Sequence, residues 1–252
     1  MKRIIVLALG ITTFISCKNN TDKTSELDNL KATTTNPTEV SKSADWRVLF
    51  DGSSFDNFKE YLKDEVSENW KIEDNAMVFY PPKDRKKGEA FNLVTKDTYT
   101  NFVLSLEWKI AEGGNSGIFW GIKENTSLSE AYQTGPEIQV LDNERHPDAK
   151  AGTTHQAGAL YDMVAPSKDV TKPVGEWNTC VLTINHKKNQ GSVVLNGEEI
   201  LSFPVNDPEW SAMVAKSKFA DWNYFGKYPT GKIGLQDHGD GVAFKNIKIK
   251  EL

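Results

Sequence analysis

Short runs of β-branched and aromatic residues recur along the chain after position 45, and clusters of Gly, Pro, Asn and Asp separate them. Such residues pack well on a pleated surface and the clusters are typical of turns, so the pattern predicts many short strands. No alternation of strands with helical patterns is visible, which disfavours a parallel α/β sheet. The segments predicted to form strands are residues 47–50, 76–80, 91–95, 102–110, 117–122, 137–141, 157–161, 178–185, 192–195, 200–203, 232–236 and 242–250.

Two local signals add a hairpin and a helix to this picture. The pair Asn196-Gly197 separates two of the strand segments, and it is the strongest short-range signal for an antiparallel hairpin. Asp207 as N-cap and Pro208 at the first helical position predict one helix over residues 209–218. About a dozen strands with one peripheral helix fit an all-β fold, a jelly-roll β-sandwich in which one curved sheet presents a groove.

The first residues of the chain have the pattern of an export signal. Lys2 and Arg3 precede an apolar run over residues 4–15. This run is too short for a permanent membrane span but has the length of a secretory signal. Cys17 follows at once, as in the lipobox of bacterial lipoproteins. The alternative is an ordinary signal peptide with a chance cysteine near its end.

We therefore predict three parts: a lipoprotein signal peptide over 1–16, a lipidated cysteine with a disordered tether over 17–44, and a folded domain over 45–252. The tether is rich in Thr, Asn, Ser and Lys and offers almost nothing to bury. Acyl chains on Cys17 would hold the protein at a membrane surface without a transmembrane helix. The expected location is that of an exported lipoprotein of the outer membrane, periplasm or cell surface.

The charge and the cysteine content limit which binding partners and which cross-links are expected. The 252 residues include 30 basic and 35 acidic side chains, and the basic residues form no long cluster. Nucleic acid is not an expected partner, because phosphate-rich ligands need a concentrated positive field. With only two cysteines, no disulfide framework is expected. The apolar neighbours of Cys180 predict a buried strand residue rather than a nucleophile.

Several short motifs resemble those of one family, the 3-keto-disaccharide hydrolase domain. The resemblance covers essentially all of residues 45–252, and the motifs occur in the family's order. They are LFDG (49–52), GNSGIF (114–119), GPEIQVLD (135–142), GALY (158–161), GEWN (175–178) and GLQDHG (234–239).

This resemblance implies a concanavalin-like jelly-roll fold, and the family is common in secreted and lipoprotein form in Bacteroidetes. It also implies a carbohydrate substrate, because members are associated with pathways in which a glycoside is oxidised at C3 and then cleaved. The sequence departs from the family at one place. An aromatic residue and an arginine often follow the GIF motif, whereas Trp120 and Gly121 follow it here. The contact made by that arginine in relatives is therefore in doubt.

Glu137 and Gln139 are the first candidate site residues. Side chains alternate along a strand, so these two share one face of segment 137–141 while Ile138 and Val140 share the other. We expect the apolar pair to face the core and the polar pair to face a sugar on the concave sheet. The alternative is a solvated polar face without a function.

His238 and His155 are the candidate bases. In segment 232–240, alternation places Gln236 and His238 on one face, at the end of a strand that glycines interrupt. His155 leads into the predicted strand 157–161 from a loop of small residues. An imidazole titrates near neutral pH, which suits a residue that accepts a proton during turnover.

The other expected substrate contacts are motif residues and aromatic rings. Aromatic faces stack on sugars, although most aromatic residues of a sandwich belong to its core. His146 and His186 lie in charged or turn segments and are expected to be solvated. The predicted contacts are Gln139, Gln236, Asn115, Asp237, Trp120 and Tyr161, with Tyr132, Trp222 and Tyr224 as further candidate rings.

No cofactor is expected from the motifs. The spacings HxxxH, HExxH and CxxC, which are typical of transition-metal sites, do not occur. A structural Ca²⁺ held by loop carboxylates such as Asp142 or Asp240 stays open. GxSxG and Gly-rich phosphate loops are also missing, which disfavours serine hydrolases and kinases.

These residue types suit the cleavage of a 3-keto-glycoside. Its carbonyl acidifies the C2 proton, and the enolate formed by removing that proton can expel the group on C1. One base and hydrogen-bond donors at the enolate oxygen are sufficient. We assign His238 or His155 as the base and Glu137 as its orienting partner or as the leaving-group acid. Gln139 and Gln236 are assigned to the substrate or its oxyanion.

Two alternatives remain at this stage. A conventional glycoside hydrolase on the same fold needs a second carboxylate opposite Glu137, and residues 137–142 do not match the ExDxxE pattern of laminarinases. A non-catalytic carbohydrate-binding module needs only a groove and aromatic rings, and would keep its binding after loss of His155 and His238.

Overall fold

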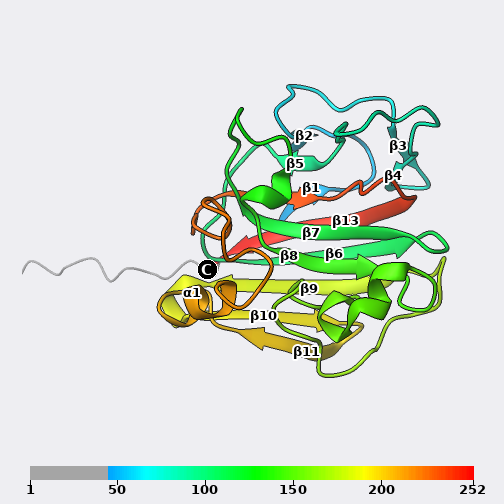
Figure 1. The fold of residues 1–252 in the computed structure, drawn as a ribbon. Coiled ribbons are helices and arrows are strands. Elements are labelled where there is room, and N and C mark those ends of the chain that lie inside the picture. The colour runs from blue at the N-terminus through cyan, green and yellow to red at the C-terminus, as the bar shows by residue number, and fades with distance from the viewer. Residues whose placement is uncertain (1–44) are drawn as a thin grey trace, which may run out of the picture. The chain divides into compact units, whose positions relative to one another are not determined.

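The computed structural model describes residues 45–252, and two antiparallel β-sheets dominate it (Figure 1). The predicted signal peptide, Cys17 and the tether lie outside the described residues. Among the described residues, no helix combines the length and the apolar character that crossing a bilayer would require. The sheets share one hydrophobic core, so the predicted jelly-roll β-sandwich is confirmed.

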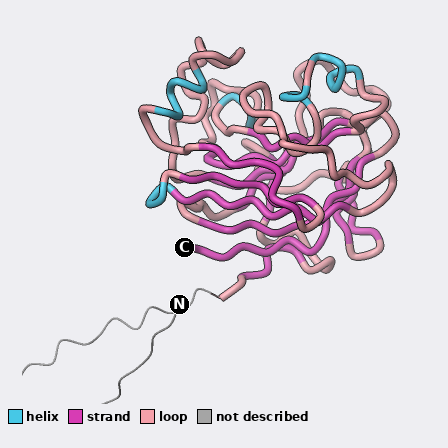
Figure 2. Tube along the Cα trace, turned by 90° about the horizontal axis from the view of Figure 1, so that it is seen from below, coloured by secondary structure: helices cyan, strands magenta, loops and turns pink. Residues whose placement is uncertain are grey.

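The larger sheet has eight strands and the smaller sheet has five. Most of the short helices lie along one side of the strands, at the top of Figure 2. In spatial order the larger sheet contains β11 (Glu198–Phe203), β10 (Gln190–Leu195), β9 (Asn178–Asn185), β6 (Phe102–Ile110), β13 (Val242–Glu251), β4 (Ala76–Phe79) and β3 (Trp70–Glu73), and β1 (Arg47–Phe50) also pairs with β13. The smaller sheet contains β2 (Phe58–Glu60), β5 (Leu93–Thr95), β12 (Lys232–Leu235), β7 (Asn115–Ile122) and β8 (Glu137–Leu141).

The burial of the strands follows the two-residue period of their sequences. In β6 every second side chain is buried, so Leu104, Leu106 and Trp108 point into the core. In contrast, β7 and β8 are buried along their whole length. Their second face is therefore covered as well, and the segments that cover it shape the candidate site. Cys180 in β9 is buried, and burial raises the pKa of its thiol to about 12.

Most predicted strands are present, but the predicted strand over residues 157–161 is wrong. This segment runs along the free edge of β8 and makes irregular backbone bonds with it. Gly158 N donates to Gln139 O over 2.8 Å, and Tyr161 N donates to Glu137 O over 3.0 Å. Gly158 has a φ of +85°, which is incompatible with a regular strand. Sequence patterning also missed β2 and β3, which are only three and four residues long.

The predicted helix is present but shorter than expected. α1 spans Glu209–Val214 instead of residues 209–218. Pro208 rather than the predicted Asp207 is the N-cap residue, and Asp207 lies one residue earlier, where its side chain accepts a hydrogen bond from Ser211 N (3.2 Å). At the other end, both the backbone N and the hydroxyl of Ser217 donate to Val214 O (3.0 and 2.8 Å), and this tightened turn ends the helix. The described residues also form four short 3-10 helices: η1 (Ala131–Gln133), η2 (Pro147–Ala151), η3 (Thr153–His155) and η4 (His186–Lys188).

Candidate active site

A cavity of about 350 Å³ opens on the face of the smaller sheet that points away from the core. Its floor comes from β7, β8 and the end of β12, and its walls come from loops. We call it the Glu137 cavity. It is lined by Asn115, Tyr132, Gly135, Glu137, Gln139, Tyr161, Lys218, Phe219, Trp222, Phe225, Gln236 and His238.

The polar floor results from strand alternation and register. Glu137 and Gln139 of β8 point into the cavity, whereas Ile138 and Val140 lie in the core, as the sequence predicted. Gly117 of β7 pairs with Gln139, and Gln236 N donates to Gly117 O over 2.9 Å. Three neighbouring strands thus bring their polar side chains together. The alternative of a solvated polar face is excluded, because Gln139 is only 2% exposed.

Three side-chain amides of the floor are not satisfied by the protein. The amide oxygens of Asn115, Gln139 and Gln236 are buried and have no hydrogen-bond partner among the described residues. A buried polar group left unpaired costs about 1–3 kcal/mol, whichever way each amide is turned. A ligand with several hydroxyl groups would relieve this cost, so the floor suits a sugar.

One wall of the cavity is aromatic. Phe219 and Phe225 stack with ring centroids 3.9 Å apart, and Trp222 meets Phe219 edge to face at 5.1 Å. Tyr132 lies 5.9 Å from Trp222 across the same wall. Such rings present flat apolar faces to a ligand. Tyr132 and Trp222 were candidate rings in the sequence, whereas the two phenylalanines were not, because their loop has no repeating pattern.

Glu137 is a neutral acid in this environment. Burial raises the pKa of its carboxyl group to about 8, against the opposing positive charges of His238 and Lys218. The side chain folds over Gly117, where an added Cβ would lie 2.1 Å from Glu137 Oε1. Because Gly117 has no side chain, the Glu137 carboxyl group can occupy the space above it. At neutral pH the group carries a proton that it can donate.

His238 lies at the rim of the cavity, in a turn that follows β12. Its φ of +36° is unusual for a residue with a side chain, and the glycine that follows completes the turn. Partial burial lowers the pKa of His238, but the neighbouring acidic groups, Asp240 first among them, outweigh this effect and hold it above its ordinary value. His238 Nδ1 lies 3.8 Å from Asp240 Oδ2. The ring is thus a stronger base than an isolated histidine.

Asp237, expected to contact substrate, does not reach the cavity. It is 1% exposed, and its Oδ2 lies 2.6 Å from Arg85 Nη1. Its backbone N donates to Asn92 Oδ1 over 3.2 Å. Alternation turns it away from its neighbours Gln236 and His238, toward the segment that carries Arg85. Asp237 therefore anchors the turn that contains His238.

His155, the other candidate base, is also not part of the cavity lining. Both ring nitrogens are occupied, Nδ1 by Asp148 Oδ1 at 2.9 Å and Nε2 by Asp162 Oδ1 at 3.0 Å. The hydroxyl of Tyr161, which does line the cavity, donates to Asp148 Oδ2 over 2.8 Å. Burial and this aspartate raise the pKa of Tyr161. His155 thus supports the wall behind Tyr161, and Lys218 N joins the network by donating to Asp162 Oδ2 over 2.7 Å.

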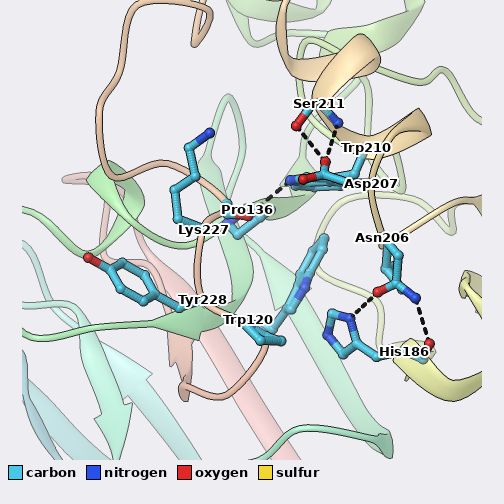
Figure 3. Close-up of a pocket in the computed structure, with 12 residues that line it drawn as sticks. Trp120, Pro136, His186, Asn206, Asp207, Trp210, Ser211, Lys227 and Tyr228 are labelled. Carbon is cyan, nitrogen blue, oxygen red and sulfur yellow. Dashed lines mark hydrogen bonds between the residues drawn. The ribbon is translucent and has the colours of Figure 1, made fainter.

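Trp120 lies in a separate hollow and does not reach the Glu137 cavity (Figure 3). It shares a face of β7 with Ile118, opposite to the face of Gly117 over which Glu137 lies, so it cannot stack on a sugar there. Tyr224 is exposed and lines neither cavity. Lys218 is a wall residue that sequence analysis missed, and its Nζ lies 4.0 Å from the centroid of the Tyr161 ring.

One group among residues 45–252 has a spacing compatible with a metal ion. His146, His238 and Asp240 bring their ligand atoms within 4.8 Å of one another. However, His146 Nδ1 accepts a hydrogen bond from Asp148 N over 3.1 Å, which leaves the proton of the neutral ring on Nε2. That nitrogen then offers no lone pair to a metal. Asp142 is similarly committed, since its carboxylate accepts from the backbone N of Gly113 and of Glu144 (2.8 and 3.1 Å). The expectation of a cofactor-free site stays a prediction.

A jelly-roll sandwich with a buried acid, unpaired amides and an aromatic wall around one cavity has the architecture of a carbohydrate-active protein. Residues 45–250 match the model of the 3-keto-alpha-glucoside-1,2-lyase-like domain. The chain is 36% identical over 248 residues to a 3-keto-disaccharide hydrolase of Bacteroides thetaiotaomicron, covering 88% of this chain and 84% of that protein.

Solved structures agree with this match. A crystal structure provisionally described as a glycosyl hydrolase of Parabacteroides distasonis has a TM-score of 0.74 at 30% identity, covering 82% of this chain and 94% of that one. A second such structure from the same organism has a TM-score of 0.62 at 26% identity, with 82% and 100% covered. The chain belongs to the family of 3-keto-alpha-glucoside-1,2-lyase-like domains. It is a glycoside-cleaving enzyme, which disfavours the binding-module alternative.

Proposed function

We propose that this enzyme cleaves 3-keto-glycosides, including 3-keto-disaccharides, by elimination in the Glu137 cavity. The observation that carries this proposal is which titratable groups line the cavity. Among residues 45–252, Glu137 is the only carboxyl group that lines the cavity, and His238 lies at the rim of the same cavity. Hydrolysis through an oxocarbenium-like state usually needs two carboxylates, whereas elimination from a keto sugar needs one base and one acid. The family match and the printed name of the Bacteroides relative support the choice of substrate.

The proposed reaction begins at C2 of the keto sugar. Neutral His238 accepts the C2 proton, and the electron pair of the broken C–H bond forms an enolate whose charge rests on the C3 oxygen. The amide groups of Gln139, Gln236 and Asn115 lie on the cavity floor and can donate hydrogen bonds to the sugar oxygens. The enolate then expels the C1 oxygen, and Glu137 gives its proton to that leaving group. Addition of water to the unsaturated product completes a net hydrolysis.

The first test compares a glucoside with its 3-keto derivative as substrates for the purified full-length protein. We expect release of the aglycone at neutral pH from the keto form alone, with exchange of the C2 proton in D₂O. We also expect EDTA to leave the rate unchanged, because neither proton transfer requires a metal.

Three results would contradict parts of this proposal. Release from the unmodified glucoside would indicate conventional hydrolysis, and release from neither would contradict the cleavage of keto sugars. Loss of activity in EDTA, restored by a divalent metal, would contradict the cofactor-free mechanism and direct attention to His146, His238 and Asp240.

Gly117→Ala is expected to lower kcat/KM for the keto substrate by at least about tenfold. The added methyl group would occupy the place of the Glu137 carboxyl group, since Cβ would lie 2.1 Å from Oε1 and 2.6 Å from Cδ. The side chain can turn into the cavity, so we expect little change in the thermal unfolding temperature. Gly241→Ala is the matched control, because its nearest contact outside the neighbouring residues is Ala111 Cβ at 3.3 Å. Equal activity of both variants would show that the position of Glu137 is unimportant.

A further inference from the structure

A second cavity, of about 200 Å³, lies beside the Glu137 cavity (Figure 3). We call it the Trp120 hollow. None of its lining residues also lines the Glu137 cavity. The two cavities are separated by two chain segments that are joined by a hydrogen bond from Gly226 N to Thr134 O (2.9 Å). Pro136 lines the Trp120 hollow, and its neighbour Gly135 lines the Glu137 cavity. The proposed reaction makes no use of this hollow.

The hollow contains a buried acceptor without a partner. Asn206 Nδ2 donates to His186 O over 2.6 Å, which identifies Oδ1 as the atom that faces the His186 ring. That oxygen can only accept, so the neighbouring ring nitrogen, His186 Nδ1 at 2.8 Å, carries the proton. In the neutral ring Nε2 therefore bears a lone pair, and it is buried with no partner among the described residues. His186 was expected to be a solvated turn residue, but the structure gives it this fixed tautomer.

The remaining lining combines aromatic rings with polar groups, several of which already have partners within the protein. Trp120 and Trp210 turn their rings toward the hollow in Figure 3, and Tyr228 lines its edge. The indole nitrogen of Trp210 is already used, because it donates to Gly226 O over 2.9 Å. Asp207 is likewise engaged, since its Oδ1 accepts from both the backbone N and the hydroxyl of Ser211. What the hollow offers a ligand is ring surface, one buried acceptor and the ammonium group of Lys227, an exposed lining residue.

This combination selects the chemistry of the ligand. An anion could pair with Lys227, but it has only acceptors to offer His186 Nε2 and would lie near the Asp207 carboxylate, so it is disfavoured. An apolar ligand would leave the buried acceptor unpaired. A pyranose ring has apolar C–H faces that stack on aromatic rings and hydroxyl groups that donate hydrogen bonds. We propose that the Trp120 hollow is a second, non-catalytic binding site for one neutral pyranose ring. This site does not depend on the reaction proposed for the Glu137 cavity.

The test uses ¹⁵N-labelled full-length protein and follows the indole N–H signals of its seven tryptophans. The probe is D-glucose, and its open-chain analogue D-glucitol is the control, since it has the hydroxyl groups but no ring face. We expect glucose to shift the signals of Trp120 and Trp210 saturably, with a dissociation constant on the order of millimolar. Trp222 reports separately on the Glu137 cavity. In Glu137→Gln, the shifts of Trp120 and Trp210 should persist, so this test is independent of the proposed reaction.

Two tyrosines four positions apart provide matched variants. Tyr228→Ala removes a ring that lines the hollow, and we expect it to weaken glucose binding by about fivefold. Tyr224→Ala removes an exposed ring that does not line it, and should change binding by less than about twofold. Absence of a glucose shift at Trp120 and Trp210 would overturn the proposal. An equal response to glucitol, or equal binding by the two variants, would overturn it as well.

Discussion

His238→Ala is expected to lower kcat/KM for a 3-keto-glucoside by at least about 10²-fold, because it removes the group that takes the C2 proton. Exchange of the C2 proton in D₂O should fall by a similar factor, since exchange requires the same transfer. Added imidazole should restore part of both rates by entering the space at the cavity rim. A variant that keeps near-normal turnover while remaining folded would remove His238 from the mechanism.

The acid side of the pH profile gives an independent check on His238. The base works only in its neutral form, so activity is expected to rise with pH through the pKa of His238. That pKa lies above the ordinary histidine value because the neighbouring acidic groups, Asp240 first among them, outweigh the effect of burial. Asp240→Asn removes one of these charges, so we expect the acid limb of kcat/KM to move to lower pH. An unmoved limb would assign that titration to another group.

Glu137→Gln is expected to lower cleavage of keto-disaccharides by about 10²–10³-fold. The amide has the shape of the neutral acid and fits over Gly117, but it has no proton to give to a departing sugar. Aglycones that leave readily without a proton, such as nitrophenolate, should lose far less. The measurement is therefore the dependence of kcat on the pKa of the leaving group, which should be steep in the variant and shallow in the native enzyme. Equal losses for all aglycones would contradict the role of Glu137 as acid.

We expect the titration of Glu137 to set the alkaline side of the pH profile as well. Burial raises the pKa of Glu137 to about 8, so the donating form is lost as pH rises through that value. We expect kcat/KM for a keto-disaccharide to fall above about pH 8, and the limb to vanish in Glu137→Gln with a nitrophenyl aglycone. Glu130→Gln provides the control. Burial also raises the pKa of Glu130, but this residue lies outside the cavity lining and should not alter the leaving-group dependence.

The period of two along each strand made much of the site predictable. It assigned Glu137 and Gln139 to one face of β8. It also assigned Gln236 and His238 to one face of segment 232–240. All four residues line the Glu137 cavity. The same alternation shows why two expectations failed. Trp120 shares the face of Ile118 in β7, and Asp237 points away from its two neighbours, so neither reaches the cavity.

Other features depended on contacts between distant segments. The local pattern made His155 a candidate base and His146 a solvated residue, yet His155 is held between two aspartates while His146 lies beside His238, with ring centroids 6.1 Å apart. The strand expected over 157–161 failed because Gly158 takes a positive φ and the segment bonds irregularly to the edge of β8. Loops lack a repeating pattern, so their positions come from the surfaces on which they pack.

By itself, the sequence determined the sandwich and the polar face, because strand formation and side-chain alternation are local properties of the chain. Only the tertiary structure decided that this face forms the floor of a cavity. The loops that carry Tyr161, Phe219 and Trp222 cover it, exclude water from Glu137 and thereby keep its carboxyl group protonated. The chemistry proposed for the acid depends on that burial, which strand patterning alone does not encode.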